Sequence, residues 1–179
     1  MNTINDALEV IAVGESFRTR LARWGFNFFP AYWATGARLT YIAADWREVR
    51  LKLPLTWRTR NYVGTIFGGS MFGALDPIYM VMLIKALGRD YVVWDKAATI
   101  RFRRPARTTL QARFLLPEST LQEIRRELSQ AAVVERVFSI ELTDEAGTVH
   151  ASVEKTIRIA RHDAPAPHAQ EVTDMSGGA

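Results

Sequence analysis

The chain of 179 residues contains no cysteine, which excludes disulfide bonds, cysteine-ligated zinc and a cysteine nucleophile. Its only histidines are His150, His162 and His168, so a histidine-rich metal site is not expected. The chain does not begin with the positively charged stretch followed by an apolar one that is typical of a secretory signal. We find no uninterrupted apolar run near the ~20 residues that span a bilayer. These absences predict a cytoplasmic protein with no metal, no cofactor and no membrane span.

The charge balance is only mildly basic, with 23 Lys and Arg against 19 Asp and Glu and a net charge of +4. Many nucleic-acid binders are far more skewed, so nucleic acid is not the expected partner, and anionic small molecules suit this balance equally well. The hydrophobic content of 48% is enough for one packed domain.

Hydrophobic periodicity predicts the elements along the chain. Residues 5–25 read as a helix with Gly14 as a weak point, and residues 26–33 hold an aromatic cluster that either packs under a sheet or lines an apolar pocket. Alternation from residue 37 predicts a hairpin turning near Ala44 and Asp45. Further expected elements are a long helix at 68–87 ended by Gly88, strands at 91–103, 108–116, 133–143 and 148–159, and a short helix at 117–128.

This order predicts an α+β fold in which about six largely antiparallel strands curve around one long, buried helix. We expect an N-terminal helical extension at 1–34, the main domain at 35–160, and a flexible tail at 161–179 that is rich in Ala, Pro and Gly.

The segment from Asn61 to Tyr79 carries the expected chemistry. Its glycine-rich turn precedes an apolar helical pattern, and bare backbone N–H groups at a helix start can bind a carbonyl oxygen or an anion. Asp76 follows two turns later among apolar residues, where a carboxylate is costly unless it has a partner or a role. Together they form half of an acyl-transfer site, with donors to polarise a carbonyl and a base nearby.

The sequence Phe67-Gly-Gly-Ser-Met-Phe-Gly-Ala-Leu-Asp76 resembles the H-G-G-x-x-x-x-x-x-D signature of hot-dog thioesterases of the phenylacetate-pathway type. Asn61, the run from Gly64 to Gly69, Asp76-Pro77 and the run from Tyr91 to Ala98 resemble the branch of hot-dog proteins known only as a domain of unknown function. The resemblance covers residues 35 to 160. It implies a hot-dog fold, an acyl thioester of coenzyme A or acyl carrier protein as substrate, and a homodimer or tetramer.

Phe67 replaces the signature histidine, which removes a polar group and makes the entrance more apolar. The resemblance implies Asp76 as base or nucleophile and the Gly68 and Gly69 amides as oxyanion donors. Two structural alternatives remain for Asp76. It caps a helix that begins at Pro77, or Pro77 kinks a longer helix so that the carboxylate is presented.

Other candidate residues lie near this segment. Asn61 either orients a water or carbonyl at the catalytic centre or closes its own loop as an Asx turn. Arg103 and Arg104 suit the phosphates of coenzyme A or an acidic carrier, or form a solvated strand edge. The remaining candidates for substrate contact are Phe67, Gly68, Phe72 and Tyr79.

Two functions follow as hypotheses. The first is an acyl thioesterase, and the second is a non-catalytic protein that holds an acyl chain in an apolar tunnel, which Phe67 in place of histidine favours. A hydratase ranks last because it needs a histidine base near the helix start, and only His150 is available, near a turn.

Overall fold

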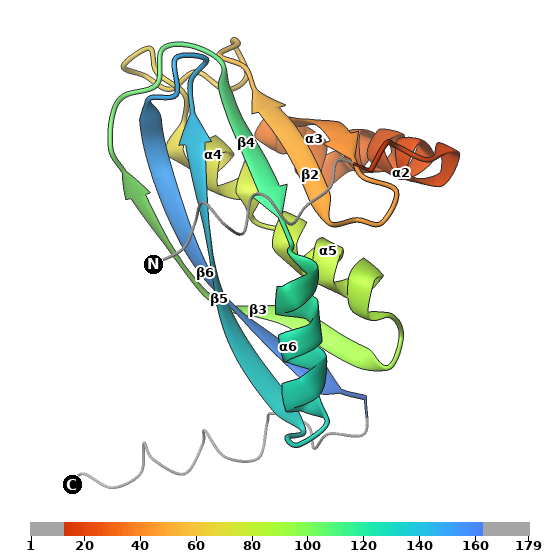
Figure 1. Ribbon diagram of the computed structural model, residues 1–179. Coiled ribbons are helices and arrows are strands. Elements are labelled where there is room, and N and C mark those ends of the chain that lie inside the picture. Colours follow the sequence, from red (N-terminus) through yellow and green to blue (C-terminus); the bar gives the residue numbers. More distant parts are fainter. Residues whose placement is uncertain (1–12, 163–179) are drawn as a thin grey trace, which may run out of the picture.

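Six strands form one antiparallel sheet in the order β1-β2-β4-β5-β6-β3, in a computed structural model that describes residues 13–162 (Figure 1). The strands are β1 Arg38–Ile42, β2 Glu48–Leu53, β3 Tyr91–Phe102, β4 Leu110–Leu115, β5 Val133–Thr143 and β6 Val149–Arg161. The other neighbouring strands pair along most of their length, with single register shifts in three of the pairs, whereas between β4 and β5 the register holds only Gln111 opposite Thr143. The sheet therefore opens at this point.

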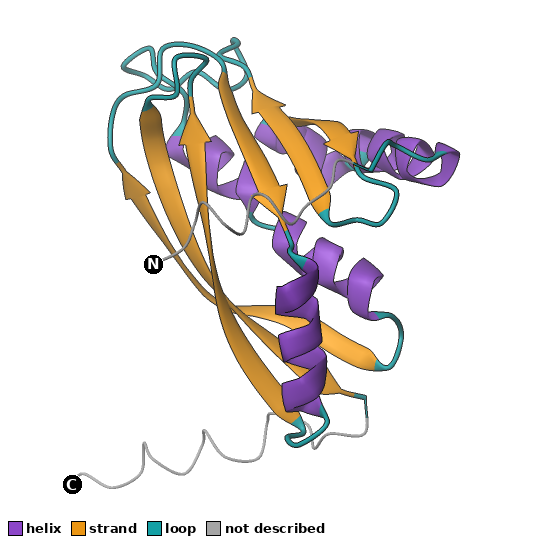
Figure 2. Ribbon diagram, viewed as in Figure 1, coloured by secondary structure: helices purple, strands orange, loops and turns teal. Residues whose placement is uncertain are grey.

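Helices lie against this sheet and at its edge (Figure 2). They are α2 Phe17–Phe28, α3 Pro30–Thr35, α4 Gly68–Leu75, α5 Ile78–Leu87 and α6 Glu118–Leu128. α4 and α5 follow one another along the sheet, with contacts from α4 to β2 and β6 and from α5 to β3. The predicted α+β architecture, with a curved sheet around a long helical segment, is confirmed.

The apolar stretch 68–87 forms the core rather than a membrane span. Its 20 residues are long and apolar enough to cross a bilayer, contrary to our reading of the sequence, but half of the stretch is buried inside the fold. Ala74, Leu75, Met82 and Leu83 are fully buried. Their apolar area is removed from water by the sheet, at roughly 25 cal/mol per Å².

The hairpin and the later strands lie where the sequence predicts them. The N-terminal helix differs, because it begins at Phe17 with Ser16 as its cap and Gly14 lies outside it. The side chain of Ser16 accepts from Thr19 N while Thr19 Oγ1 accepts from Ser16 N, and this capping box fixes the helix start. The predicted helical residues 5–12, and all but the first two residues of the predicted tail, lie outside the described residues.

Candidate functional site

The long helix predicted at 68–87 is interrupted at Asp76 and Pro77. Asp76 N still donates to Phe72 O at 3.0 Å, so the chain is helical up to this residue. Pro77 has no N–H to give to the carbonyl of Gly73, and the helix restarts at Ile78. No side chain caps α5, so the alternative in which Asp76 is its N-cap is wrong and the kink is what the structure shows.

The Asp76 carboxylate turns to β6, where it meets Lys155. Lys155 is fully buried, and its Nζ donates to the Asp76 carbonyl oxygen, to Asp76 Oδ1 at 3.0 Å and to Asp95 Oδ2 at 2.7 Å. An ammonium group has three N–H donors, and all three are engaged. The carbonyl and carboxylate of Asp76 are thus held by one cation, which fixes the side chain relative to its own backbone.

The two carboxylates that share Lys155 differ in exposure. The Asp76 side chain is 46% exposed and the Asp95 side chain 22% exposed. Burial raises the pKa of Asp95 above its usual value, and this outweighs the opposing hydrogen bond and charge of Lys155, while the charge of Asp76 raises it further. Asp95 Oδ1 is buried and has no hydrogen-bond partner among the described residues.

The glycine pair predicted to supply oxyanion donors lies at the start of α4. Phe67 is the cap residue, and its N–H donates to Thr59 O at 2.7 Å. Within residues 13–162 the amides of Gly68 and Gly69 have no acceptor. Helix-start amides of this kind favour a bound oxyanion.

Two phenyl rings explain why both positions are glycine. A Cβ on Gly69 would lie 2.3 Å from the Phe67 ring, and one on Gly68 would lie 2.8 Å from the Phe102 ring. Phe67 and Phe102 are 56% and 59% exposed. The rings therefore pack against the glycines and form an apolar rim at the helix start.

Asn61 is engaged in its own loop. Its Oδ1 accepts from Val63 N at 3.1 Å and Thr65 N at 2.9 Å, and its Nδ2 donates to Thr65 Oγ1 at 2.8 Å. These bonds form the Asx-type turn that precedes the glycine pair. Both ends of the amide are used, so Asn61 shapes the loop that holds Phe67.

Tyr79 and Phe72 lie on the sheet side of the helices. Tyr79 is buried between Phe114 and Phe138, with ring centroids at 5.0 and 4.7 Å, and burial raises its pKa to about 12. It lines a cleft of about 1170 Å³ at the opening between β4 and β5. The lining of this cleft includes neither Asp76 nor the glycine pair, while Phe72 packs partly buried against the core.

Arg103 and Arg104 continue from the end of β3, and both backbone amides donate to His150 O, at 2.8 and 3.2 Å. Phe102 precedes them and touches Gly68, so this end of β3 lies beside the glycine end of α4. Lys155, which holds Asp76, lies opposite Ala98 in the β3–β6 pair. Ala98 precedes Phe102 by four residues, so the arginines lie more than about 13 Å along the strand from the Asp76 end of the site. Arg103 also lines a smaller cleft of about 340 Å³ with Arg101 and Glu154.

Lys155 is the site residue that we did not identify from the sequence. It occupies an inward position in β6, in the alternating buried series that includes Val153 and Ile157. A lysine at an inward position of a strand indicates acidic or carbonyl partners inside the fold, because a buried ammonium group needs them. Asp95 lies in the run from Tyr91 to Ala98, for which the sequence indicated no chemical role. Within the described residues no cluster of three His, Asp or Glu side chains could hold a metal ion.

Comparisons with known proteins show the family and the fold of the chain. A family described as a domain of unknown function, DUF4442, matches residues 18–159. The chain belongs to this family. No protein of curated function matches it significantly.

Solved structures similar to this DUF4442 chain share its fold at low sequence identity. A Pseudomonas aeruginosa protein of unknown function, called a probable thioesterase, is 23% identical with a TM-score of 0.71, over 85% of this chain and 100% of its own. A thioesterase from Haemophilus influenzae is 14% identical with a TM-score of 0.61, over 86% and 100%. A Chlorobaculum tepidum protein of unknown function is 13% identical with a TM-score of 0.66, over 84% and 98%. The predicted hot-dog fold is confirmed.

Proposed function

We propose that this DUF4442 protein is a cytoplasmic hydrolase of acyl thioesters, with Asp76 as the base or nucleophile. The observation that carries the proposal is the state of the Asp76 carboxylate, whose Oδ1 is held by a buried lysine while the side chain is 46% exposed. A fixed carboxylate with one oxygen open to solvent is suited to accept a proton from water or to attack a carbonyl.

The amides of Gly68 and Gly69 are the proposed oxyanion donors. They are unengaged at a helix start, where the helix dipole favours developing negative charge. In the hydrolysis that we propose, water attacks the thioester carbon as its proton passes to Asp76. The amides stabilise the tetrahedral oxyanion, and the thiolate leaves and is then protonated.

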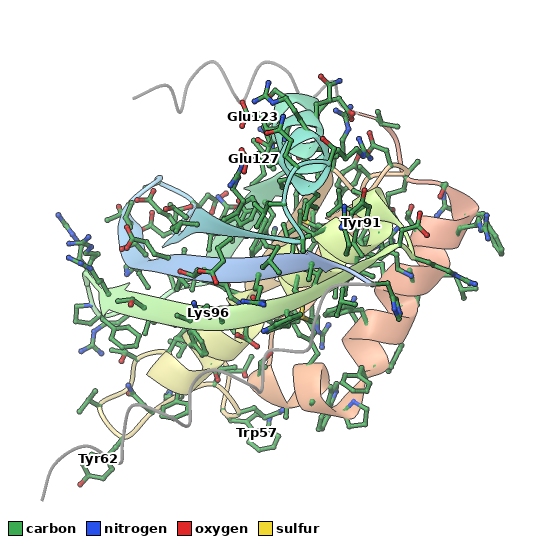
Figure 3. The ribbon with its side chains drawn as sticks, turned by 90° about the horizontal axis from the view of Figure 1, so that it is seen from below. Trp57, Tyr62, Tyr91, Lys96, Glu123 and Glu127 are labelled. Carbon is green, nitrogen blue, oxygen red and sulfur yellow. The ribbon has the colours of Figure 1, made fainter. Side chains whose placement is uncertain are left out.

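We propose that two copies of the chain complete the site. The glycine amides begin α4 and Asp76 follows its last residue, so the two groups are separated by about 10 Å of helix rise. A two-fold dimer can place the glycine amides of one copy opposite Asp76 of the other. The edge strand β3, with Lys96 to Thr99 exposed in a row, is the surface we assign to this pairing (Figure 3).

Arg103 and Arg104 are the proposed contacts for the carrier. They lie at the glycine end of α4, and both are exposed. Guanidinium groups there can bind the phosphates of coenzyme A or an acidic carrier protein while the thioester reaches the amides.

The test is hydrolysis of a panel of acyl-coenzyme A esters, from short to long and aromatic, by the wild-type protein and Asp76→Asn. We expect turnover to fall by about 100-fold or more in the variant, the scale of a lost general base. Asp90→Asn, at an exposed turn residue, is the matched control and should leave turnover unchanged. Equal turnover by Asp76→Asn would remove Asp76 from the mechanism.

A non-catalytic acyl-binding protein is the second candidate, and one observation favours it. The Phe67 ring packs on Gly69, where the related signature has a histidine, so the amides are bordered by an apolar ring. No turnover of any ester, together with tight retention of a fatty acid or acyl ligand, would support this function instead.

A further inference from the structure

Helix α2 presents an apolar stripe to solvent. Its inner face is fixed on the fold by Thr19, which is buried, and by Asn27, whose Oδ1 accepts from Leu39 N at 2.7 Å while its Nδ2 donates to Leu39 O at 3.0 Å. The opposite face carries large apolar side chains at i, i+4, i+7 and i+11, all within about 60° of one another around the helix axis. They are Phe17, Leu21, Trp24 and Phe28, with exposures of 78%, 64%, 55% and 66%.

The stripe continues into α3 and the loop after β2. Phe29 and Trp33 are 60% and 52% exposed, and Trp57 is 87% exposed. Arg58 stacks over the Trp33 ring at 3.7 Å, which joins the loop to α3. Figure 3 shows Trp57 directed away from the fold at the margin where the N-terminal helices lie. We call these seven side chains, from Phe17 to Trp57, the aromatic band.

The band lies in a basic part of the chain. Residues 13–75 contain nine Lys and Arg and three acids, Glu15, Asp45 and Glu48, and all three acids are paired with arginines. Arg18 and Arg20 lie on either side of the α2 stripe and are exposed. Large exposed apolar patches mark interaction surfaces, and this one is rimmed by cations.

We propose that the aromatic band binds the surface of an anionic membrane. Trp side chains prefer the boundary between headgroups and acyl chains, and an amphipathic helix with Phe, Leu and Trp on one face lies in that plane. Arginines at the rim then meet anionic headgroups. The inference is independent of the thioesterase proposal, because it uses none of the residues of the Asp76 site.

A second copy fits this surface poorly. A two-fold contact places the same patch on both partners, so it would bring one set of arginines against another without acids to neutralise them. Single-stranded nucleic acid is also disfavoured, because Phe17, Leu21 and Phe28 form a continuous apolar row along a helix rather than separate platforms for bases.

The experiment measures partitioning of the full chain onto phosphatidylcholine vesicles with and without one-quarter phosphatidylglycerol, by co-sedimentation and Trp fluorescence. We expect binding to the anionic vesicles only. Trp24→Ala with Phe28→Ala should reduce the partition coefficient at least ~10-fold through lost apolar burial. Arg18→Glu with Arg20→Glu should reduce it similarly, since each arginine near the surface contributes about fivefold.

Matched controls are Val137→Ser, which alters an exposed apolar residue on β5, and Arg89→Glu with Arg126→Glu, which changes the charge equally elsewhere. Both should bind as the wild type does. Three results would overturn the proposal. They are no binding to any vesicle, binding that survives the Trp24 and Phe28 changes, or an oligomer that those changes dissociate, which would make the band a contact between copies.

A deletion of residues 1–12 tests whether the N-terminal segment of the same chain, rather than a membrane, covers the aromatic band. If the deletion increases quenching of the Trp fluorescence by acrylamide and vesicles bind neither form, the N-terminal segment covers the band and the membrane proposal fails. If the deleted chain binds anionic vesicles at least as well as the full chain, the proposal stands.

Discussion

Two buried charge centres in this molecule are opposite in composition. One carboxylate, Glu48, is 1% exposed and accepts from Arg50 and Arg113 at 2.6 Å each, and both arginines are 47% exposed. One ammonium, Lys155, is fully buried between two carboxylates. The first centre has excess positive charge at the surface, and the second has excess negative charge around a buried cation.

The two centres also differ in the kinds of element that they join. Arg50 is two residues from Glu48 on β2, and Arg113 lies opposite Arg50 on β4, so neighbouring strand positions build the whole centre. Lys155 joins β6 to β3 and to the break between α4 and α5, 79 residues away in sequence. We infer that the Glu48 centre stabilises a strand pair, whereas the Lys155 centre fixes a helix break against the sheet and leaves Asp76 half-exposed.

The largest expected effect comes from removing the buried cation. Lys155→Met leaves Asp76 and Asp95 without their shared partner, and breaking a buried ion pair costs about 3–5 kcal/mol. The measurement is urea unfolding at pH 7. Arg125→Met is the matched control, because Arg125 pairs with Glu118 on α6 where both side chains are over one-third exposed, and the loss of this pair should cost under about 1 kcal/mol. Equal losses of unfolding free energy in the two variants would mean that the buried Lys155 cluster stabilises the fold no more than a surface ion pair does.

Glu48→Gln should cost less than Lys155→Met. The glutamine keeps an oxygen to accept from the arginines but loses the charge, and hydrogen bonds to charged groups contribute about 1.5–3 kcal/mol. Both arginines can return to water, so we expect a loss of about 1–2 kcal/mol in urea unfolding. Glu118→Gln, at the surface pair with Arg125, is the control. A loss above that of Lys155→Met would reverse the proposed order.

Sequence reasoning predicted the parts of this fold that local patterns encode. Alternation located the hairpin and the four later strands, and the Asp-Pro pair pointed to the break at Asp76 as one of two structural options. Lys155 was missed because its partners come from distant elements, although its inward position in β6 was visible. The outward stripe of α2 was missed too, because an apolar helical period identifies a face but not which side of the helix the sheet covers.

Asn61→Ala should have a smaller effect on stability, because its hydrogen bonds are confined to one loop. Three bonds to Val63 and Thr65 hold the turn, and their loss should cost about 1 kcal/mol in urea unfolding. If Asn61 acts only through the loop, thioester turnover by Asn61→Asp should stay near that of the wild type, because the carboxylate still accepts from both amides. A fall of about 100-fold in that variant would instead make Asn61 part of the catalytic centre.

The smallest effect is a change in the pH dependence of stability, and it separates the two centres by sign. Burial raises the pKa of Glu48, but hydrogen bonds from Arg113 and Arg50 outweigh this and hold the pKa below its usual value. The contribution of Glu48 to stability is therefore present above its unfolded-state pKa of about 4.3, and it is lost as pH falls through its pKa in the folded state. The pKa of Asp95 is raised by burial, so its contribution is present below about 3.9 and is lost as pH rises through the folded value.

The urea midpoint of the wild type, Glu48→Gln and Asp95→Asn between pH 3 and pH 8 measures this difference. Glu48→Gln should flatten the loss of stability on the acid side, because the variant has no carboxylate to protonate there. Asp95→Asn should flatten the loss of stability as pH rises above about 4. This holds whatever the absolute stability of the variant, because the slope of stability against pH depends only on the difference in protons bound by the folded and unfolded states. If both variants flatten the same limb, Asp95 is not held with a raised pKa, and the ammonium of Lys155 outweighs the burial of its second carboxylate.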